Sequence, residues 1–191
     1  MRKRSQILIG FLVVAVAALL IVRALHTPPR EAVRSELDLR DGVLYLHGET
    51  RPFSGLLVED FTKGQRKLAI DVRYGKVNGI SRGWYDNGQR EVEETFVAGV
   101  SDGLRTRWHR NGQKKSEEHI EHGHVNGPYV EWYDNGRKAV TMTVRDGQPE
   151  GEVMAWYPDG APKSRSHFAG GKMVDREFFP SPTPATEVAR Q

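Results

Sequence analysis

Three histidines lie within one short stretch, His119-Ile-Glu-His122-Gly-His124, which is the best candidate for metal chemistry in the chain. Imidazole nitrogen is a common zinc ligand, and the three rings would converge if the turn folded back at this point. The alternative is a polar turn that happens to contain three histidines, because the rest of the chain has no matching set. We expect no bound metal here, and isothermal titration with zinc before and after His122→Ala would test this.

Other groups that could carry out catalysis are absent or badly placed. Cysteine does not occur, which excludes a thiolate nucleophile, a thiolate metal site and a disulfide. Carboxylates occur in adjacent pairs, Glu93-Glu94 and Glu117-Glu118, and neighbouring residues of a strand point to opposite faces. The sequence has no serine nucleophile elbow, phosphate-binding glycine loop or dinucleotide motif. We therefore predict a protein with no catalytic residues, no cofactor and no enzymatic activity.

Glycine and tryptophan recur at a fixed spacing of 24 residues. Fifteen of the 20 glycines fall on three positions of one frame, and all four tryptophans fall on a fourth position. The glycines are Gly55, Gly79, Gly103, Gly127 and Gly151; Gly64, Gly88, Gly112, Gly136 and Gly160; and Gly75, Gly99, Gly123, Gly147 and Gly171. The tryptophans are Trp84, Trp108, Trp132 and Trp156. This period predicts stacked structural repeats at 55–78, 79–102, 103–126, 127–150 and 151–174.

Each repeat has the sequence pattern of a β-hairpin. An aromatic segment leads into a turn such as Asp86-Asn87-Gly88, and a second segment ends in an apolar residue. Asn-Gly is a strong hairpin signal because both residues accept positive φ, so Gly88 and its equivalents Gly112, Gly136 and Gly160 are structural. One hairpin is too small to be stable alone, so neighbours must stack. The predicted fold is all-β, an elongated antiparallel β-meander of five 24-residue hairpin repeats preceded by one transmembrane helix.

The repeats are flanked by segments that lie outside the 24-residue frame. Residues 41–54 are predicted to form an N-terminal cap strand, because 41–48 has a strand-like composition. Residues 175–191 are predicted to form a closing cap at 176–179, followed by a disordered, proline-rich tail.

The tryptophans are predicted to lie opposite a recurring basic residue on the next strand. A three-residue turn loop would place Trp84 opposite Arg90, Trp108 opposite Lys114, Trp132 opposite Lys138 and Trp156 opposite Pro162. A basic side chain would then cover each indole ring. Strand parity also predicts that the tryptophans share a face with the apolar residues of the second strand, which are Leu68, Val72, Val92, Phe96, Ile120, Val140, Val144 and Phe168. We expect the tryptophans to be structural.

A second set of aromatic side chains is predicted on the opposite face. Its members are Tyr85, His109, Tyr129, Tyr133 and Tyr157. Tyrosine and histidine that face water are reasonable contacts for a binding partner. The alternative is that they only fill the space between neighbouring strands of the sheet.

The N-terminus has the composition of a membrane anchor. An unbroken apolar run spans residues 7–22, and extending it to Leu25 gives a helix of about 28 Å, close to the thickness of a bilayer core. The alternative is a cleaved signal peptide, but no good cleavage site follows the apolar run. Basic residues before the run favour a single-pass, N-in orientation, with a spacer at 26–40 and the repeats on the periplasmic or extracellular side.

The charge distribution argues against binding to nucleic acid. Residues 1–34 carry +5 and the whole chain +3, so residues 35–191 carry −2. The repeat region therefore lacks the broad positive field that binding to nucleic acid requires.

The repeated pattern Gly-x-x-x-x-Trp-Tyr-x-Asn-Gly resembles the bacterial variant of the MORN repeat, as found in YwqK-type antitoxins. The lead-in at 45–55 is similar as well, and the likeness covers about residues 41–175. The resemblance implies a hairpin sheet that binds a protein partner, in some members a toxin, and it supplies no catalytic residues. The expected function is therefore a membrane-anchored interaction or scaffold module. The alternative function is recognition of an envelope polymer or lipid, because aromatic repeat proteins can hold glycans.

Overall fold

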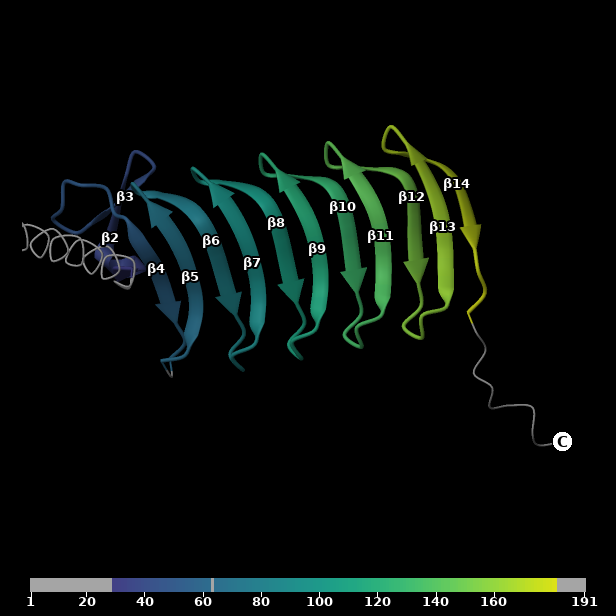
Figure 1. The fold of residues 1–191 in the computed structure, drawn as a ribbon, viewed down its shortest axis with the longest axis horizontal. Helices are drawn as coiled ribbons and strands as arrows, with labels where there is room; N and C mark the ends of the chain where they lie inside the picture. The colour runs from purple at the N-terminus through teal and green to yellow at the C-terminus, as the bar shows by residue number, and fades with distance from the viewer. Residues whose placement is uncertain (1–28, 63, 182–191) are drawn as a thin grey trace, which may run out of the picture. The chain divides into compact units, whose positions relative to one another are not determined.

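The computed structural model describes residues 29–62 and 64–181, and its elements belong to one compact unit that begins at Glu31. The structure is built almost entirely of β-strands (Figure 1). The elements are β1 (Glu31–Val33), the 3₁₀ turn η1 (Arg34–Glu36), β2 (Leu37–Arg40), β3 (Val43–Leu46), β4 (Gly55–Asp60), β5 (Arg66–Arg73), β6 (Lys76–Trp84), β7 (Arg90–Val97), β8 (Val100–Trp108), β9 (Lys114–Glu121), β10 (His124–Trp132), β11 (Lys138–Arg145), β12 (Gln148–Trp156), β13 (Pro162–Ala169) and β14 (Lys172–Phe178).

Twelve of the strands form one sheet in the order β1-β4-β5-β6-β7-β8-β9-β10-β11-β12-β13-β14. From β4 onwards every strand pairs antiparallel with the next strand in sequence, so the strands lie side by side in one row (Figure 1). The prediction of an elongated antiparallel hairpin sheet is confirmed. The sheet is not a pure meander, however, because β1 adds to the edge of β4 in the parallel direction.

Two kinds of turn alternate along the sheet. The turns that carry Asn-Gly or Asp-Gly enclose a three-residue loop, as at Tyr85, whose N–H donates to the carbonyl of Gln89. Gly88 within this loop has φ of 83°, the left-handed conformation that was predicted for it. The turns on the opposite edge have two residues at positive φ, as at Ala98 (51°) and Gly99 (92°), which is the type I′ geometry that suits twisted strands.

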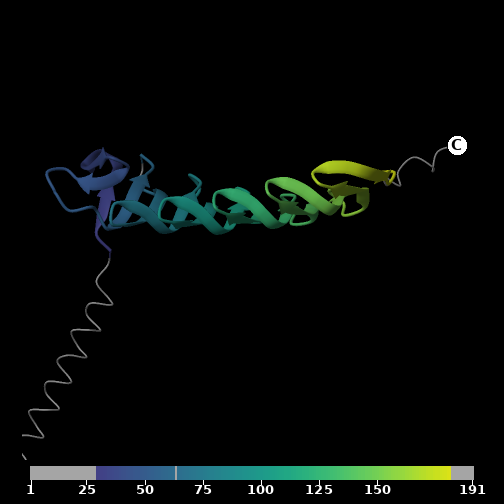
Figure 2. The ribbon, with the colours of Figure 1, turned by 90° about the horizontal axis from the view of Figure 1, so that it is seen from above.

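The hydrophobic core lies at the first-repeat end of the sheet. Ala32, Leu37, Phe53 and Val72 are buried there, and three half-buried leucines and Ile70, from β3, β4 and β5, pack around them. The hairpin of β2 and β3 forms its own two-stranded sheet, and the amide of Leu44 donates to the carbonyl of Gly75. Figure 2 shows this hairpin at the blue end of the row and no second layer over the later repeats in the part of the chain described.

The predicted tryptophan register is confirmed. Trp84 pairs with Arg90, and the equivalent pairs are Trp108 with Lys114, Trp132 with Lys138 and Trp156 with Pro162. A β-bulge precedes each pair, because Gly83 pairs with Val92 and the next step skips Glu91. The bulge moves the apolar residues to the opposite face from the tryptophans. The predicted sharing of one face is therefore wrong, because strand parity does not continue through a bulge.

Residues 41–54 do not form a single cap strand. Asp41 and Gly42 make a tight turn between β2 and β3, and an isolated bridge joins Tyr45 to Pro52. At the other end, the predicted closing strand forms as β14 and begins at Lys172, earlier than expected.

No helix among residues 29–62 and 64–181 has the length and apolar character needed to span a membrane. The predicted anchor at residues 7–25 lies outside the residues that the structure describes.

Candidate functional site

The aromatic residues that follow the tryptophans connect one repeat to the next. The hydroxyl of Tyr85 donates to the carbonyl oxygen of Trp108 at 2.8 Å. The hydroxyl of Tyr133 donates in the same way to the carbonyl oxygen of Trp156, and the Nε2–H of His109 donates to the carbonyl oxygen of Trp132, both at 2.8 Å. At the end of the row, Tyr157 donates to the carbonyl of Phe179 at 3.3 Å. These side chains therefore support the turn edge, and their polar atoms already have partners within the chain.

A parallel row of amide bonds lies beside this aromatic row. The Nδ2 of Asn87 donates to the carbonyl of Arg110 at 2.8 Å, and Asn111 and Asn135 repeat the contact one and two repeats later. The Oδ1 of each asparagine accepts an N–H from the residue two positions further on, which closes the loop. Each turn is thus shaped by its own asparagine and held to the next turn by the same side chain.

The tryptophan face, which carries Trp84, Trp108, Trp132 and Trp156, holds its basic side chains between the rings. The guanidinium of Arg90 lies 5.7 Å from the ring centre of Trp84 and 5.8 Å from that of Trp108. Lys114 lies 5.8 Å from the ring centre of Trp132, in the repeat after its own. The predicted cover by the strand partner is found for Trp84, whereas Trp108 and Trp132 are covered by the basic residue of the preceding repeat.

The opposite face carries a continuous row of polar side chains across four strands, and we call it the ionic face. Cross-strand pairing aligns Glu94 with Arg105, Arg105 with Glu118, and Glu118 with Tyr129. Arg105 forms ion pairs with both glutamates, and Arg107 forms a second ion pair with Glu118. The side chain of Glu118 is only 7% exposed, so the network is largely withdrawn from water.

The electrostatics of this row are set by burial and by its own charges. Burial alone raises the pKa of Glu94, but hydrogen bonds from Arg105 and Ser101 outweigh that effect and lower the pKa below its usual value. Burial, followed by the negative charge of Glu131, raises the pKa of Tyr129 to about 12. At neutral pH Glu94 is therefore ionised and Tyr129 is a neutral phenol.

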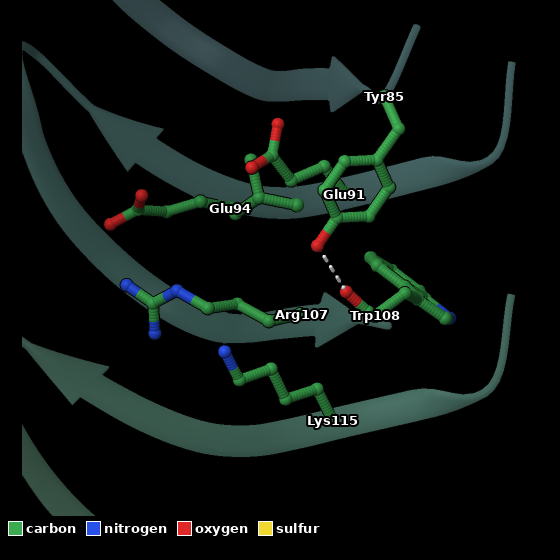
Figure 3. A pocket seen from close by; sticks show the side chains of 7 residues that line it. Tyr85, Glu91, Glu94, Arg107, Trp108 and Lys115 are labelled. Carbon is green, nitrogen blue, oxygen red and sulfur yellow. Dashed lines mark hydrogen bonds between the residues drawn. The ribbon is translucent and has the colours of Figure 1, made fainter. Parts of the chain in front are cut away.

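A shallow, open hollow of about 430 Å³ lies next to this row. Figure 3 shows Tyr85 and Glu91 on one side and Arg107 and Lys115 on the other, with the indole of Trp108 turned away. Glu91 and Lys115 form no ion pair among the described residues. The hollow widens the ionic face into a surface that carries aromatic, cationic and anionic groups together.

The three histidines of the 119–124 stretch do not converge on one point, because His122 and His124 line one hollow and His119 lines another. His119 pairs with Leu104 and lines a small hollow of about 190 Å³ on the tryptophan face. His122 occupies a type I′ turn at φ of 51°, and His124 begins β10. No group of three or more metal-binding side chains occurs among residues 29–62 and 64–181.

Of the predicted aromatic set, only Tyr129 belongs to the central row of the ionic face. Sequence reasoning missed the charged partners of that row, which are Glu94, Arg105, Arg107 and Glu118. A signal was present, because opposite charges occupy positions that pair in the predicted register of neighbouring strands.

Comparison with known proteins identifies the repeat. A family model described as the MORN repeat variant matches residues 77–98 and 101–122, which hold the hairpins β6–β7 and β8–β9. MORN repeats are in general modules that bind proteins or lipids. A search of curated proteins finds no match. The chain therefore contains two adjacent segments that are similar to the MORN repeat variant, and these segments contribute the charged residues of the ionic face.

Proposed function

We propose that this MORN-repeat protein is a non-catalytic scaffold that binds a protein partner on its ionic face. The observation that supports the proposal is that the cluster of buried apolar residues Ala32, Leu37, Phe53 and Val72 lies at the first-repeat end, whereas the later repeats bury single apolar side chains such as Ile120 and Val144. From β7 to β10 the ionic face has no covering layer among the described residues, yet it holds an ordered row of arginine, glutamate and tyrosine. Arginine and tyrosine are enriched among the residues that dominate binding energy at protein interfaces.

The geometry favours a partner whose charges complement the ionic face and whose shape fits the hollow beside it. Arg105 and Glu94 are already paired and largely buried, so their positions are fixed before binding. A fixed surface loses little conformational entropy when a partner binds. Arg107 remains 42% exposed and the hollow beside it is open, so a partner side chain has access to both.

We propose further that residues 7–25 anchor the chain in the cytoplasmic membrane, with the sheet on the exported side. The apolar run and the basic residues before it support this placement. An antitoxin or immunity protein is one version of the function, in which the partner is a toxin. The slightly acidic charge of residues 35–191 would suit a basic partner.

The partner can be sought with the full chain in its native membranes. Tagged wild-type protein, Arg107→Ala and Arg82→Ala would each be cross-linked, purified and analysed by mass spectrometry. Arg82 is a matched control because it is a half-buried arginine in one ion pair, with Glu93, on the tryptophan face. We expect a protein that is recovered with wild type and Arg82→Ala and is depleted at least tenfold with Arg107→Ala.

Two results would contradict the proposal. Equal recovery with all three chains would remove the ionic face as the binding surface. If no protein partner is recovered and the purified protein sediments with peptidoglycan or liposomes, the result would favour the alternative of envelope-polymer or lipid recognition.

The membrane placement has its own test. Because the chain has no cysteine, Tyr74→Cys introduces a single thiol at a site that is 81% exposed. A membrane-impermeant maleimide added to intact cells should label this thiol, and deletion of residues 7–25 should release the protein from membranes. Labelling only after cell lysis would contradict the exported orientation.

A further inference from the structure

Strand β14 ends the sheet, and its outer edge has no neighbouring strand in the part of the chain that the structure describes. All seven of its residues are exposed. They include three large apolar side chains, with Met173 at 53%, Val174 at 66% and Phe178 at 67% exposure. An edge of this kind presents unpaired backbone N–H and C=O groups and pairs readily with another strand.

The opposite end of the sheet offers much less free strand edge for pairing than β14 does. Its edge strand β1 has only three residues, and the core contributed by Ala32, Leu37 and Phe53 packs there. A chain with one long open edge can pair with a second copy of itself, and the pairing then stops at two because each open edge has been used.

The charges of β14 suit a second copy. The strand carries two cations, Lys172 and Arg176, and two anions, Asp175 and Glu177, so its formal charge is zero. A bulge at Val174 separates the pairs that this strand makes with β13. Because of the bulge, Lys172 and Glu177 lie on the tryptophan face although their numbers differ in parity, as shown by their partners Ala169 and Arg165.

We propose that two copies of the protein join through antiparallel pairing of their β14 strands, related by a two-fold axis. In one register Lys172 lies opposite Glu177 of the second copy, and Met173 lies opposite Arg176. Both pairs keep their side chains on matching faces of the sheet, as cross-strand contacts require. A shift of one residue in either direction would place Lys172 opposite Arg176, or Asp175 opposite Asp175 of the second copy, and pairs of like charge are disfavoured.

The dimer has a consequence for binding. A two-fold axis perpendicular to the sheet places both ionic faces on the same side of one continuous sheet. A partner with two copies of its own site would then bind with avidity. The pairing itself does not depend on the proposed partner, so the two ideas can fail separately.

Charge reversal tests the register in the purified full chain in detergent micelles, with protein mass measured by light scattering. We expect wild type to be a dimer, and Lys172→Glu or Glu177→Lys alone to raise the dimer dissociation constant at least tenfold. The double variant Lys172→Glu with Glu177→Lys should restore the dimer. Lys76→Glu is the matched control, because Lys76 is also exposed and also begins a strand directly after a type I′ turn.

Disulfide trapping tests the same register independently. In the cysteine-free chain, Lys172→Cys combined with Glu177→Cys places two thiols on one strand, about 16 Å apart and too far to join within one copy. Oxidation should therefore give a species of twice the chain mass on a denaturing gel. A monomeric wild type, or a dimer that neither charge reversal nor oxidation of the cysteine variant affects, would overturn the proposal.

Discussion

The hydroxyl of Tyr85 donates a hydrogen bond to the main-chain carbonyl of Trp108, one repeat further along the chain. The same contact recurs down the sheet, and a histidine replaces the tyrosine at His109. These bonds connect the hairpins along the turn edge, where no ladder of strand hydrogen bonds is available. Removing one of them should therefore weaken the junction between two repeats without altering either hairpin.

Tyr85→Phe should reduce the free energy of unfolding by about 1 kcal/mol, because the carbonyl of Trp108 loses its hydrogen-bond donor. Tyr74→Phe is the control, because the Tyr74 side chain is 81% exposed on the other edge of the sheet. Urea denaturation followed by circular dichroism would measure both variants. Equal stability of the two would show that the bond contributes nothing to the junction.

The type I′ turn at 98–99 should respond oppositely to two substitutions. Ala98 adopts φ of 51°, which glycine accepts more readily, so Ala98→Gly should stabilise the protein by up to about 1 kcal/mol. Gly99→Ala should destabilise it by about 1 kcal/mol or more, although an added Cβ would meet no atom within 4 Å. Thermal melts would show the two shifts, and a loss of stability in both variants would contradict the turn assignment.

The ion pairs of the ionic face predict a stability that falls in acid. The folded-state pKa of Glu94 lies below its usual value of 4.5, so its stabilising contribution is present above that value. The contribution is lost as the pH falls through the lowered pKa. Melting temperatures measured between about pH 5 and pH 2 should therefore fall less steeply for Glu94→Gln than for wild type.

Glu152→Gln is the control for this experiment, because Glu152 makes an exposed ion pair with Arg165. Exposed pairs contribute little to stability, so its profile should follow wild type. Identical slopes for Glu94→Gln and wild type would show that the network does not hold Glu94 in its ionised form.

Tyr129 should ionise unusually late in alkali. Burial and the charge of Glu131 raise its pKa to about 12, because the phenolate would be formed beside a carboxylate in a half-buried site. Ultraviolet titration should show that Tyr129→Phe removes an ionisation near pH 12. Loss of an ionisation near pH 10 instead would indicate that Tyr129 is exposed to solvent.

The sequence predicts the repeat, the turns and the strand register well, because glycine at positive φ fixes a turn at two of its three recurring positions, those of Gly88 and Gly99. The pairing of Trp84 with Arg90 follows from that geometry alone. The two faces could not be assigned in the same way, because nothing in the local composition marks Glu91 as the residue that the bulge skips. The added parallel strand β1 was equally hidden, since its three residues pair only after β4 exists.

The candidate site was predicted less well for a related reason. Tyr85 and Tyr133 were candidate binding residues because exposed aromatics often bind partners, but their hydroxyls bond to carbonyls in the next repeat. Such contacts depend on the distance between adjacent hairpins, which sequence spacing alone does not provide. Tyr129 differs because it lies on β10, within the charged row.

From β5 onwards each strand forms its backbone ladder only with its neighbours in sequence, and this has a mechanical consequence. A force that pulls on the C-terminus would act on β14 first and would break the hydrogen bonds between β14 and β13 one after another. The hairpins would then detach in order, each releasing a similar length of chain at a modest force. The packed first-repeat end would hold longest, so a protein tethered at its N-terminus could lengthen under tension while keeping its base intact.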